Sequence, residues 1–350
     1  MVLNRAAVAA VDVSLPARLL VDLPNWVGDH VMALPTVQRL VAGNVGGLTV
    51  LHCRPAVRRL LELLYPTTEV IGSPRRASPL RLAVELRSRW RRFDLGVTLR
   101  HASRAKLLLC LAARSTFGSS GGGAVLLLSR SDPVDRTRHQ VFDGDPLLAA
   151  LGLPVVDPEW RPELPGGLRD EGLRLMAATG VPSSVAVGLA PGAAWGESKR
   201  WPTSRFGQLA AGLHRRGLRA VVVVGPGEEQ LAAEVASAAG LPLPVVGTGV
   251  DVAGLAGVLV HLAVLVGNDS GPVQLAVMVG VPVVALFGPT NPVRTGPRGC
   301  GNAVVSRGLR CAPCLEARCP LVHSDCLAGL AVAEVEEAVL GVLGHKDVGG

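Results

Sequence analysis

Aromatic residues are scarce in this chain of 350 residues, where Phe, Trp and Tyr together make up 3%. A protein that recognises bases or sugars mainly by ring stacking needs more of them, so the composition argues against such a site. Low-complexity tracts and internal repeats are also missing. Hydrophobic residues make up 49% of the chain and charged residues 18%, which excludes an intrinsically disordered protein.

Membrane-targeting segments are absent as well. Asp12 interrupts the apolar part of residues 1–16, so these residues do not resemble a secretory signal. The longest uncharged apolar run, residues 252–268, contains His261 and glycines, and it predicts a helix followed by a strand rather than a membrane span. We therefore expect a cytoplasmic protein, with the cytoplasmic membrane face as a peripheral partner.

The net charge of +7 is unevenly distributed. Residues 1–150 hold 20 Lys and Arg against 11 Asp and Glu, or +9, whereas residues 151–350 hold 15 against 17, or −2. One explanation is an Arg-rich genome with solvated arginines. The functional explanation is that the first half faces an anionic partner, such as a phosphorylated lipid, a membrane surface or nucleic acid.

Seven cysteines are present, and an odd number in a chain expected to be cytosolic argues against a disulfide framework. Four of them share a short segment with a histidine at a density typical of zinc sites. The alternative is a set of reduced, partly buried thiols in a closing loop. The candidate ligands are Cys311, Cys314, Cys319, His323 and Cys326.

The first half alternates strands and helices. A strand over residues 18–23 is followed by Gly28-Asp29 and a helix over 31–42. Open α/β sheets bind ligands at this carboxyl edge. Asp29 either caps the helix or is a cleft carboxylate that accepts a proton. Residues 115–123, with four glycines, predict a mobile loop, and His139 is either an anion ligand or a solvated residue at a helix start.

The second half also alternates strands and helices, and the loop after its first strand consists largely of small residues. After a strand over residues 185–189, Gly192 and Ala193 would let backbone amides approach a pyrophosphate, and Lys199 and Arg200 would neutralise it. After the strand over 220–224, Glu228 either binds ribose hydroxyls or favours the dipole of the next helix.

Residues 263–290 predict a strand, a polar turn, a helix and a second strand, with the turn at Asn268-Asp269-Ser270-Gly271. Free N–H groups at such a helix start can hold phosphate. The alternative is an ordinary helix capped by Asp269 or Ser270. The alternation predicts two doubly wound α/β domains facing a central cleft. We place them at residues 1–160 and 181–350, with a linker region at 161–180.

Taken together, these motifs follow one another in a specific order over nearly the whole chain. They are Leu23-Pro24-Asn25-Trp26-Val27-Gly28-Asp29, Pro191-Gly192-Ala193, Lys199-Arg200-Trp201-Pro202, Asn268-Asp269-Ser270-Gly271, Phe287-Gly288-Pro289-Thr290 and the cysteine-rich tail. In this order they resemble glycosyltransferase family 9, the ADP-heptose:lipopolysaccharide heptosyltransferases, and most of all the type that adds the second inner-core heptose. The resemblance implies a GT-B fold, with the acceptor domain first and the nucleotide-sugar domain second.

The resemblance also implies roles for individual residues. Asp29 matches the general base, Lys199 the contact to the donor phosphates, and Asp269-Ser270-Gly271 the turn that holds the diphosphate. Glu228 or Glu229 matches the ribose contact. Family members usually carry a histidine where this chain has Gln274, and glutamine keeps a hydrogen-bond donor without the cationic charge. We assign the acceptor to Asn25, Trp26, Arg100 and Arg104.

The implied reaction is inverting and metal-independent, with an ADP-sugar donor, a phosphorylated glycolipid acceptor, no nucleic-acid partner and no required cofactor. Three alternatives stay open in principle: a family member acting on another acceptor, a non-catalytic nucleotide-sugar binding protein, and a dinucleotide-dependent dehydrogenase. The missing Gly-x-Gly-x-x-Gly after the first strand argues against the dehydrogenase. The presence of Asp29 and Lys199 argues against the non-catalytic binder.

Overall fold

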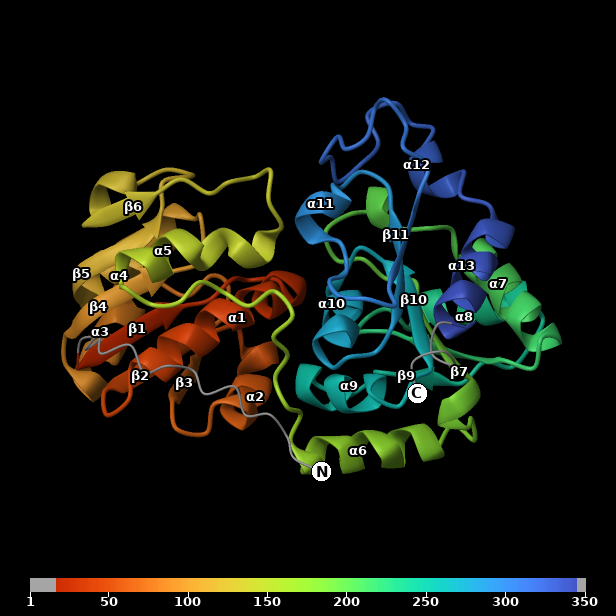
Figure 1. The fold of residues 1–350 in the computed structure, drawn as a ribbon, viewed down its shortest axis with the longest axis horizontal. Coiled ribbons are helices and arrows are strands. Elements are labelled where there is room, and N and C mark those ends of the chain that lie inside the picture. The colour runs from red at the N-terminus through yellow and green to blue at the C-terminus, as the bar shows by residue number, and fades with distance from the viewer. Residues whose placement is uncertain (1–16, 345–350) are drawn as a thin grey trace.

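The computed structural model describes residues 17–344. Residues 1–16, on which the prediction of a missing secretory signal rests, lie outside the described residues, as do residues 345–350. Two domains stand side by side, each a parallel six-stranded sheet covered by helices (Figure 1). The two doubly wound domains predicted from the alternation of strands and helices are therefore confirmed.

The sheet of the first domain has the strand order β3-β2-β1-β4-β5-β6. The order reverses between β1 and β4, and in such sheets the binding crevice opens at the carboxyl ends of these two strands. The strands are β1 Arg18–Asp22, β2 Leu48–Cys53, β3 Glu69–Gly72, β4 Phe93–Thr98, β5 Ala113–Ser119 and β6 Arg130–Asp132.

Two local predictions for this domain are wrong. Residues 115–119 do not form a mobile loop, because β5 pairs with β4 along this stretch and buries Thr116 and Phe117. The first helix begins at residue 27, four residues earlier than predicted. The helices are α1 Val27–Gly43, α2 Pro55–Leu64, α3 Pro79–Trp90, α4 Ser103–Ala112 and α5 Asp145–Ala150.

The second sheet repeats the topology, with the order β12-β11-β10-β7-β8-β9. Its central strands β7, β10 and β11 are buried along their whole length, as expected for parallel strands covered on both faces. The strands are β7 Ala186–Ala190, β8 Arg219–Val223, β9 Val245–Val246, β10 Val264–Asn268, β11 Val283–Phe287 and β12 Ala303–Ser306.

The region predicted as a linker, residues 161–180, contains a helix that packs on the second domain. This helix, α6, meets α9 where Gly172 lies against the backbone of Gly257, a contact too close for any side chain. The helices of this domain are α6 Gly166–Ala177, α7 Thr203–Arg215, α8 Glu229–Ala239, α9 Val252–Leu259, α10 Gly271–Met278, α11 Pro292–Thr295, α12 Asp325–Ala328 and α13 Val332–Gly344.

The domains meet where α1 and α10 lie side by side (Figure 1). A Cβ added to Gly271 would lie 3.1 Å from the Cβ of Val27, and one added to Gly28 would lie 3.4 Å from Cγ of Gln274. Glycine at both positions thus lets the first turns of the two helices touch. Both helices begin at the carboxyl edge of their own sheet, so the carboxyl edges of the two sheets adjoin at this contact. Within residues 17–344, no helix combines the length and apolar character needed to cross a bilayer.

Candidate active site

The donor-side motif lies at the start of α10. Strand β10 ends at Asn268, and Ser270 occupies the N-cap position of α10. Ser270 makes no side-chain capping bond, and its Oγ is buried without a partner among the described residues. The alternative of an ordinary helix capped by Asp269 or Ser270 is therefore wrong. The helix start leaves a buried hydroxyl and first-turn N–H groups for another ligand.

Lys199 and Asp269 form an ion pair beside this helix start. Nζ of Lys199 lies 2.7 Å from Oδ2 of Asp269, and the two side chains are 13% and 8% exposed. The same carboxylate oxygen accepts a hydrogen bond of 2.7 Å from the hydroxyl of Thr290. The ammonium also lies over the ring of Trp195, 5.6 Å from its centre. The loop after β7 and the turn after β10 therefore meet in one largely buried, charged cluster.

The rest of the loop after β7 is held by its own side chains. Arg200 donates from Nε and Nη2 to the carbonyl of Ala193, so it braces the loop that we expected it to help neutralise. Gly192 lies against the carboxyl group of Glu228, where a Cβ would not fit. Glu228 occupies the N-cap position of α8 and accepts a hydrogen bond of 2.8 Å from the N–H of Gly225. The predicted phosphate and ribose contacts thus lie side by side.

Gln274 is buried one turn into α10. Its Nε2 donates a hydrogen bond of 2.7 Å to the carbonyl of Thr295 at the end of α11. The amide therefore ties α11 to α10.

The cysteine-rich segment braces this donor side. The hydroxyl of Ser198 donates to the carbonyl of Glu316 at 2.5 Å, and the N–H of Leu315 donates to the carbonyl of Pro289 at 2.8 Å. Both partners adjoin the Lys199–Asp269–Thr290 cluster. The segment is thus positioned to hold the turn that carries Lys199.

All five candidate zinc ligands line one small pocket with Ser198 and Pro289. Within residues 17–344, no group of three or more His, Cys, Asp or Glu side chains is arranged to hold a metal ion. The segment therefore does not present a preassembled ligand set, and zinc stays a prediction. Metal analysis of the purified protein tests it. About one zinc per chain supports the site, because four thiolates and an imidazole suit zinc, and a metal content near zero refutes it.

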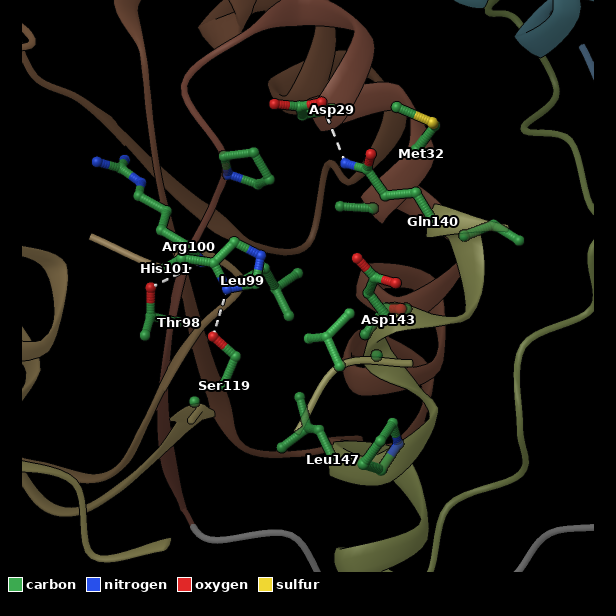
Figure 2. Close-up of a pocket in the computed structure, with 18 of the residues that line it drawn as sticks. Asp29, Met32, Thr98, Leu99, Arg100, His101, Ser119, Gln140, Asp143 and Leu147 are labelled. Carbon is green, nitrogen blue, oxygen red and sulfur yellow. Dashed lines mark hydrogen bonds between the residues drawn. The ribbon is translucent and has the colours of Figure 1, made fainter. Parts of the chain in front are cut away.

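Asp29 lies in the first turn of α1 and lines a pocket of the first domain. The N-cap of α1 is Trp26, so the interpretation of Asp29 as a helix cap is wrong. Its Oδ1 accepts a hydrogen bond of 3.1 Å from Nε2 of Gln140 (Figure 2). Burial raises the pKa of the Asp29 carboxyl, and the hydrogen bond from Gln140 and the charge of Lys199 oppose the rise. Asp269 adds to it. The charges of Lys199 and Asp269, in the other domain, therefore act on the pKa of Asp29.

A pocket of about 990 Å³, part of it open to solvent, extends from Asp29 into the first domain. It lies between α1, the carboxyl ends of β1, β4 and β5, and the segment that precedes α5 (Figure 2). Three of the four residues assigned to the acceptor line it: Asn25, Trp26 and Arg100. The structure does not bring Arg104 to this pocket, because its guanidinium donates to the carbonyls of Arg76 and Ala77.

Arg100 is neutralised by a fully buried carboxylate. Its Nη2 lies 3.1 Å from Oδ1 of Asp22, the last residue of β1. Asp22 also lies 2.6 Å from Nδ1 of His52 and accepts a hydrogen bond of 2.8 Å from Thr98. Burial alone would raise the pKa of Asp22, but Arg100, His52 and Thr98 together hold it below its ordinary value. Asp22 thus fixes Arg100 at the pocket wall.

Asp22→Ala is expected to lower the free energy of unfolding by about 3–5 kcal/mol, because it leaves the charge of Arg100 partly buried without its partner. Chemical denaturation measures the change. Thr98→Val removes the hydrogen bond to the same carboxylate and the one that Thr98 accepts from the N–H of Arg100, but it keeps the ion pair, so it should cost about 2 kcal/mol. Equal losses in the two variants would contradict this role of the ion pair.

Two residues of the pocket wall, His101 and Gln140, belong to no recognisable sequence motif. Residues 143–145, Asp-Gly-Asp, form an Asp-x-Asp pattern of the kind that often binds metal ions, and this pattern was not among the predicted motifs. Asp143 instead pairs with Arg294, and Asp145 accepts from the N–H of Val156 and pairs with Arg138. His139 is not a free anion ligand either, because its Nε2 lies 3.0 Å from the carbonyl oxygen of Gly296.

Known proteins resemble this chain over most of its length. Lipooligosaccharide heptosyltransferase 2 of Campylobacter jejuni is 25% identical over 335 residues, covering 93% of this chain and 98% of the relative. A family 9 glycosyl transferase from Veillonella parvula superposes with a TM-score of 0.83 at 20% identity, covering 95% of this chain and 99% of that one. ADP-heptose lipopolysaccharide heptosyltransferase II of Escherichia coli superposes with a TM-score of 0.77 at 20% identity, with 94% and 99% covered.

The two superpositions confirm the predicted GT-B fold. The model of glycosyltransferase family 9 (heptosyltransferase) matches residues 79–324, well over half of the chain. This stretch runs from α3 to the cysteine-rich segment and includes Lys199 and the start of α10. The chain therefore belongs to glycosyltransferase family 9, the heptosyltransferase family.

Proposed function

We propose that this protein transfers heptose from ADP-heptose to a hydroxyl of a lipopolysaccharide inner-core acceptor, with inversion at the anomeric carbon. The observation that carries the proposal is that the first turn of α1, which holds Asp29, packs against the first turn of α10, beside the Lys199–Asp269 pair: a Cβ added to Gly28 would lie 3.4 Å from Cγ of Gln274. Relatives named for ADP-heptose and for lipooligosaccharide support this donor and this class of acceptor.

The donor diphosphate is assigned to the start of α10. Helix N-termini bind phosphate through free N–H groups and the helix dipole, and the buried hydroxyl of Ser270 is available there. The ammonium of Lys199 is already held in place by Asp269 and can share its charge with a phosphate oxygen. Glu228, beside Gly192, is assigned to the ribose hydroxyls.

The reaction is a direct displacement. Asp29 takes the proton of the acceptor hydroxyl, the oxygen bonds to the anomeric carbon, and the bond from that carbon to the phosphate oxygen breaks. ADP leaves with the bonding electron pair, and Lys199 with the N–H groups of α10 stabilises the charge that develops on it. This sequence uses no metal ion. The cysteine-rich segment supports the turn of Lys199 and takes no part in the chemistry.

A second candidate is a family 9 transferase whose acceptor sugar carries no phosphate where it enters the pocket. The pairing of Arg100 with Asp22, and the position of Arg104 outside the pocket, favour this reading. Cationic side chains outside the pocket wall, such as Arg75 over the ring of Trp26, would then meet anionic groups further along a glycolipid.

We assign the protein to the cytoplasmic face of the membrane, where the excess positive charge of residues 1–150 suits anionic lipids.

A transfer screen tests the proposal. ADP-heptose, UDP-sugars and GDP-sugars are offered with a phosphorylated inner-core glycolipid, its dephosphorylated form and a free heptose, and NMR assigns the anomeric configuration of the product. Transfer from ADP-heptose to either glycolipid with inversion supports the function, and preference for the dephosphorylated form selects the second candidate. Binding of ADP-heptose without transfer to any acceptor would contradict it.

A further inference from the structure

The residues that follow His139 form a bridge between the two domains. Residues 139–143, here called the bridging segment, run along the pocket of the first domain beside α1. Gln140 and Asp143 lie on the pocket wall (Figure 2). From this segment Gln140 donates the hydrogen bond to Oδ1 of Asp29. That bond is the one hydrogen bond made by the Asp29 carboxylate to another side chain within residues 17–344.

Two side chains of the bridging segment, Asp143 and His139, reach the second domain. Arg294, on α11, makes a bidentate pair with Asp143, from Nη1 to Oδ1 at 3.0 Å and from Nη2 to Oδ2 at 2.8 Å. Nη1 also donates to the carbonyls of Asp135 and Arg138. His139 accepts the N–H of Val141 at Nδ1, so Nε2 carries the proton donated to the carbonyl of Gly296.

α11 is in turn tied to the start of α10 and the turn before it. Gln274 of α10 donates to the carbonyl of Thr295, and Thr290, just before α11, donates to Asp269. A continuous set of contacts therefore runs from the helix start assigned to the diphosphate, through Arg294 and the bridging segment, to Asp29. Arginine suits this position because its rigid fork holds a carboxylate by two parallel hydrogen bonds.

We propose that Arg294 is a positioning residue: by holding the bridging segment across the domain boundary it fixes Gln140, and Gln140 fixes the carboxylate of Asp29 for proton abstraction. The inference rests on the proposed function for its catalytic consequence. It adds that the base in the acceptor domain is aligned by a residue of the donor domain. Alignment then depends on the two domains being docked.

Other charged groups also act on the pKa of Asp29, and their effects must be distinguished from that of Arg294. Lys199 and Asp269 act from the second domain and His101 from the end of β4. None of them contacts Gln140 by a hydrogen bond or ion pair in the described part of the chain. Loss of the Gln140 bond removes a stabilising contact to the ionised carboxylate, so the pKa of Asp29 should rise when either Gln140 or Arg294 is replaced.

The experiment compares Arg294→Gln, Arg294→Lys and Gln140→Leu. Arg294→Gln is expected to lower kcat about 10²-fold, since a shift of about 1 Å at a reacting group has this effect, while the Kd for ADP stays within about twofold. Arg294→Lys keeps the charge but loses the fork, so it should recover only part of the rate. If Arg294 acted through its charge alone, the lysine variant would match the wild type and the proposal would fall.

Arg59→Gln is the matched control. Arg59 also bridges the domains, pairing with Glu171 and Asp251, but it lies on α2 outside the pocket. This variant should keep the wild-type kcat and the wild-type pKa of Asp29. An equal fall in kcat in Arg59→Gln and Arg294→Gln would mean that any loosened domain contact suffices, which overturns the specific role of Arg294.

Two further readouts complete the test. In the double variant of Arg294→Gln and Gln140→Leu, kcat should fall no further than in the more impaired single variant, because both residues act through the same contact to Asp29. A fall equal to the product of the two single effects would contradict the proposal. The carbon-13 carboxyl signal of Asp29, assigned with Asp29→Asn, gives its pKa without turnover. If the pKa of Asp29 is unchanged in Arg294→Gln, the inference is overturned. If this pKa rises but the protein transfers no heptose, the inference stands and only the proposed function is refuted.

Discussion

Asp29→Asn is expected to lower kcat by about 10²–10⁴-fold, the usual contribution of a positioned general base. Asparagine has nearly the same shape and can still accept the hydrogen bond from Gln140, so the pocket should keep its geometry. What is lost is the group that takes the proton of the acceptor hydroxyl. Single-turnover kinetics measure the chemical step, and isothermal titration should show an unchanged Kd for ADP.

The pH profile gives the same prediction a second readout. Burial raises the pKa of Asp29 above its ordinary value. The active carboxylate is lost as the pH falls through that pKa, so the acidic limb of kcat/KM should lie at a higher pH than for an exposed aspartate. Asp94→Asn, at the start of β4 and paired with Arg18, serves as the control and should keep the wild-type profile. If Asp29→Asn retained near-normal turnover, the base would have to be another group.

Lys199→Met is expected to lower kcat/KM by about 10²–10³-fold, the range found for removal of one group that stabilises developing negative charge. The ammonium is 13% exposed and lies 2.7 Å from Asp269. Its removal takes away the positive charge and leaves a buried carboxylate beside the diphosphate. Both the affinity for ADP and kcat should therefore fall.

The double variant of Lys199→Met and Asp269→Asn separates these two effects. It removes the unpaired carboxylate, so the stability and part of the ADP affinity should return, whereas kcat should stay low. A return of kcat to the wild-type value would mean that Lys199 only neutralises Asp269 and does not act on the leaving group. Thermal unfolding with and without ADP measures the first two quantities.

The sequence was sufficient to place Asp29 and the start of α10 each at the carboxyl edge of its own sheet, because both follow a buried strand and strand ends define the edge of a parallel sheet. It was not sufficient for the local role of Asp29. The helix begins at residue 27, with Trp26 as its N-cap, so the carboxylate is free to turn toward Gln140. That partner is 111 residues away in the chain, and no spacing rule connects the two.

The arginines show a second limit. Arg100 was assigned to an anionic acceptor from its charge, yet Asp22 neutralises it. This pairing could have been anticipated, since a carboxylate at the end of an apolar strand needs a partner and the sheet places β1 beside β4. The contacts of Arg104 with Arg76 and Ala77 could not, because they depend on where a loop folds back.

The most direct test of a shared site is a crystal structure of the protein with ADP. The account predicts the β-phosphate at the N–H groups of residues 270–271, in contact with Nζ of Lys199, with the Asp29 carboxylate facing it across a gap the size of one sugar ring. ADP bound elsewhere, or an Asp29 side chain turned away from the phosphate, would contradict the account.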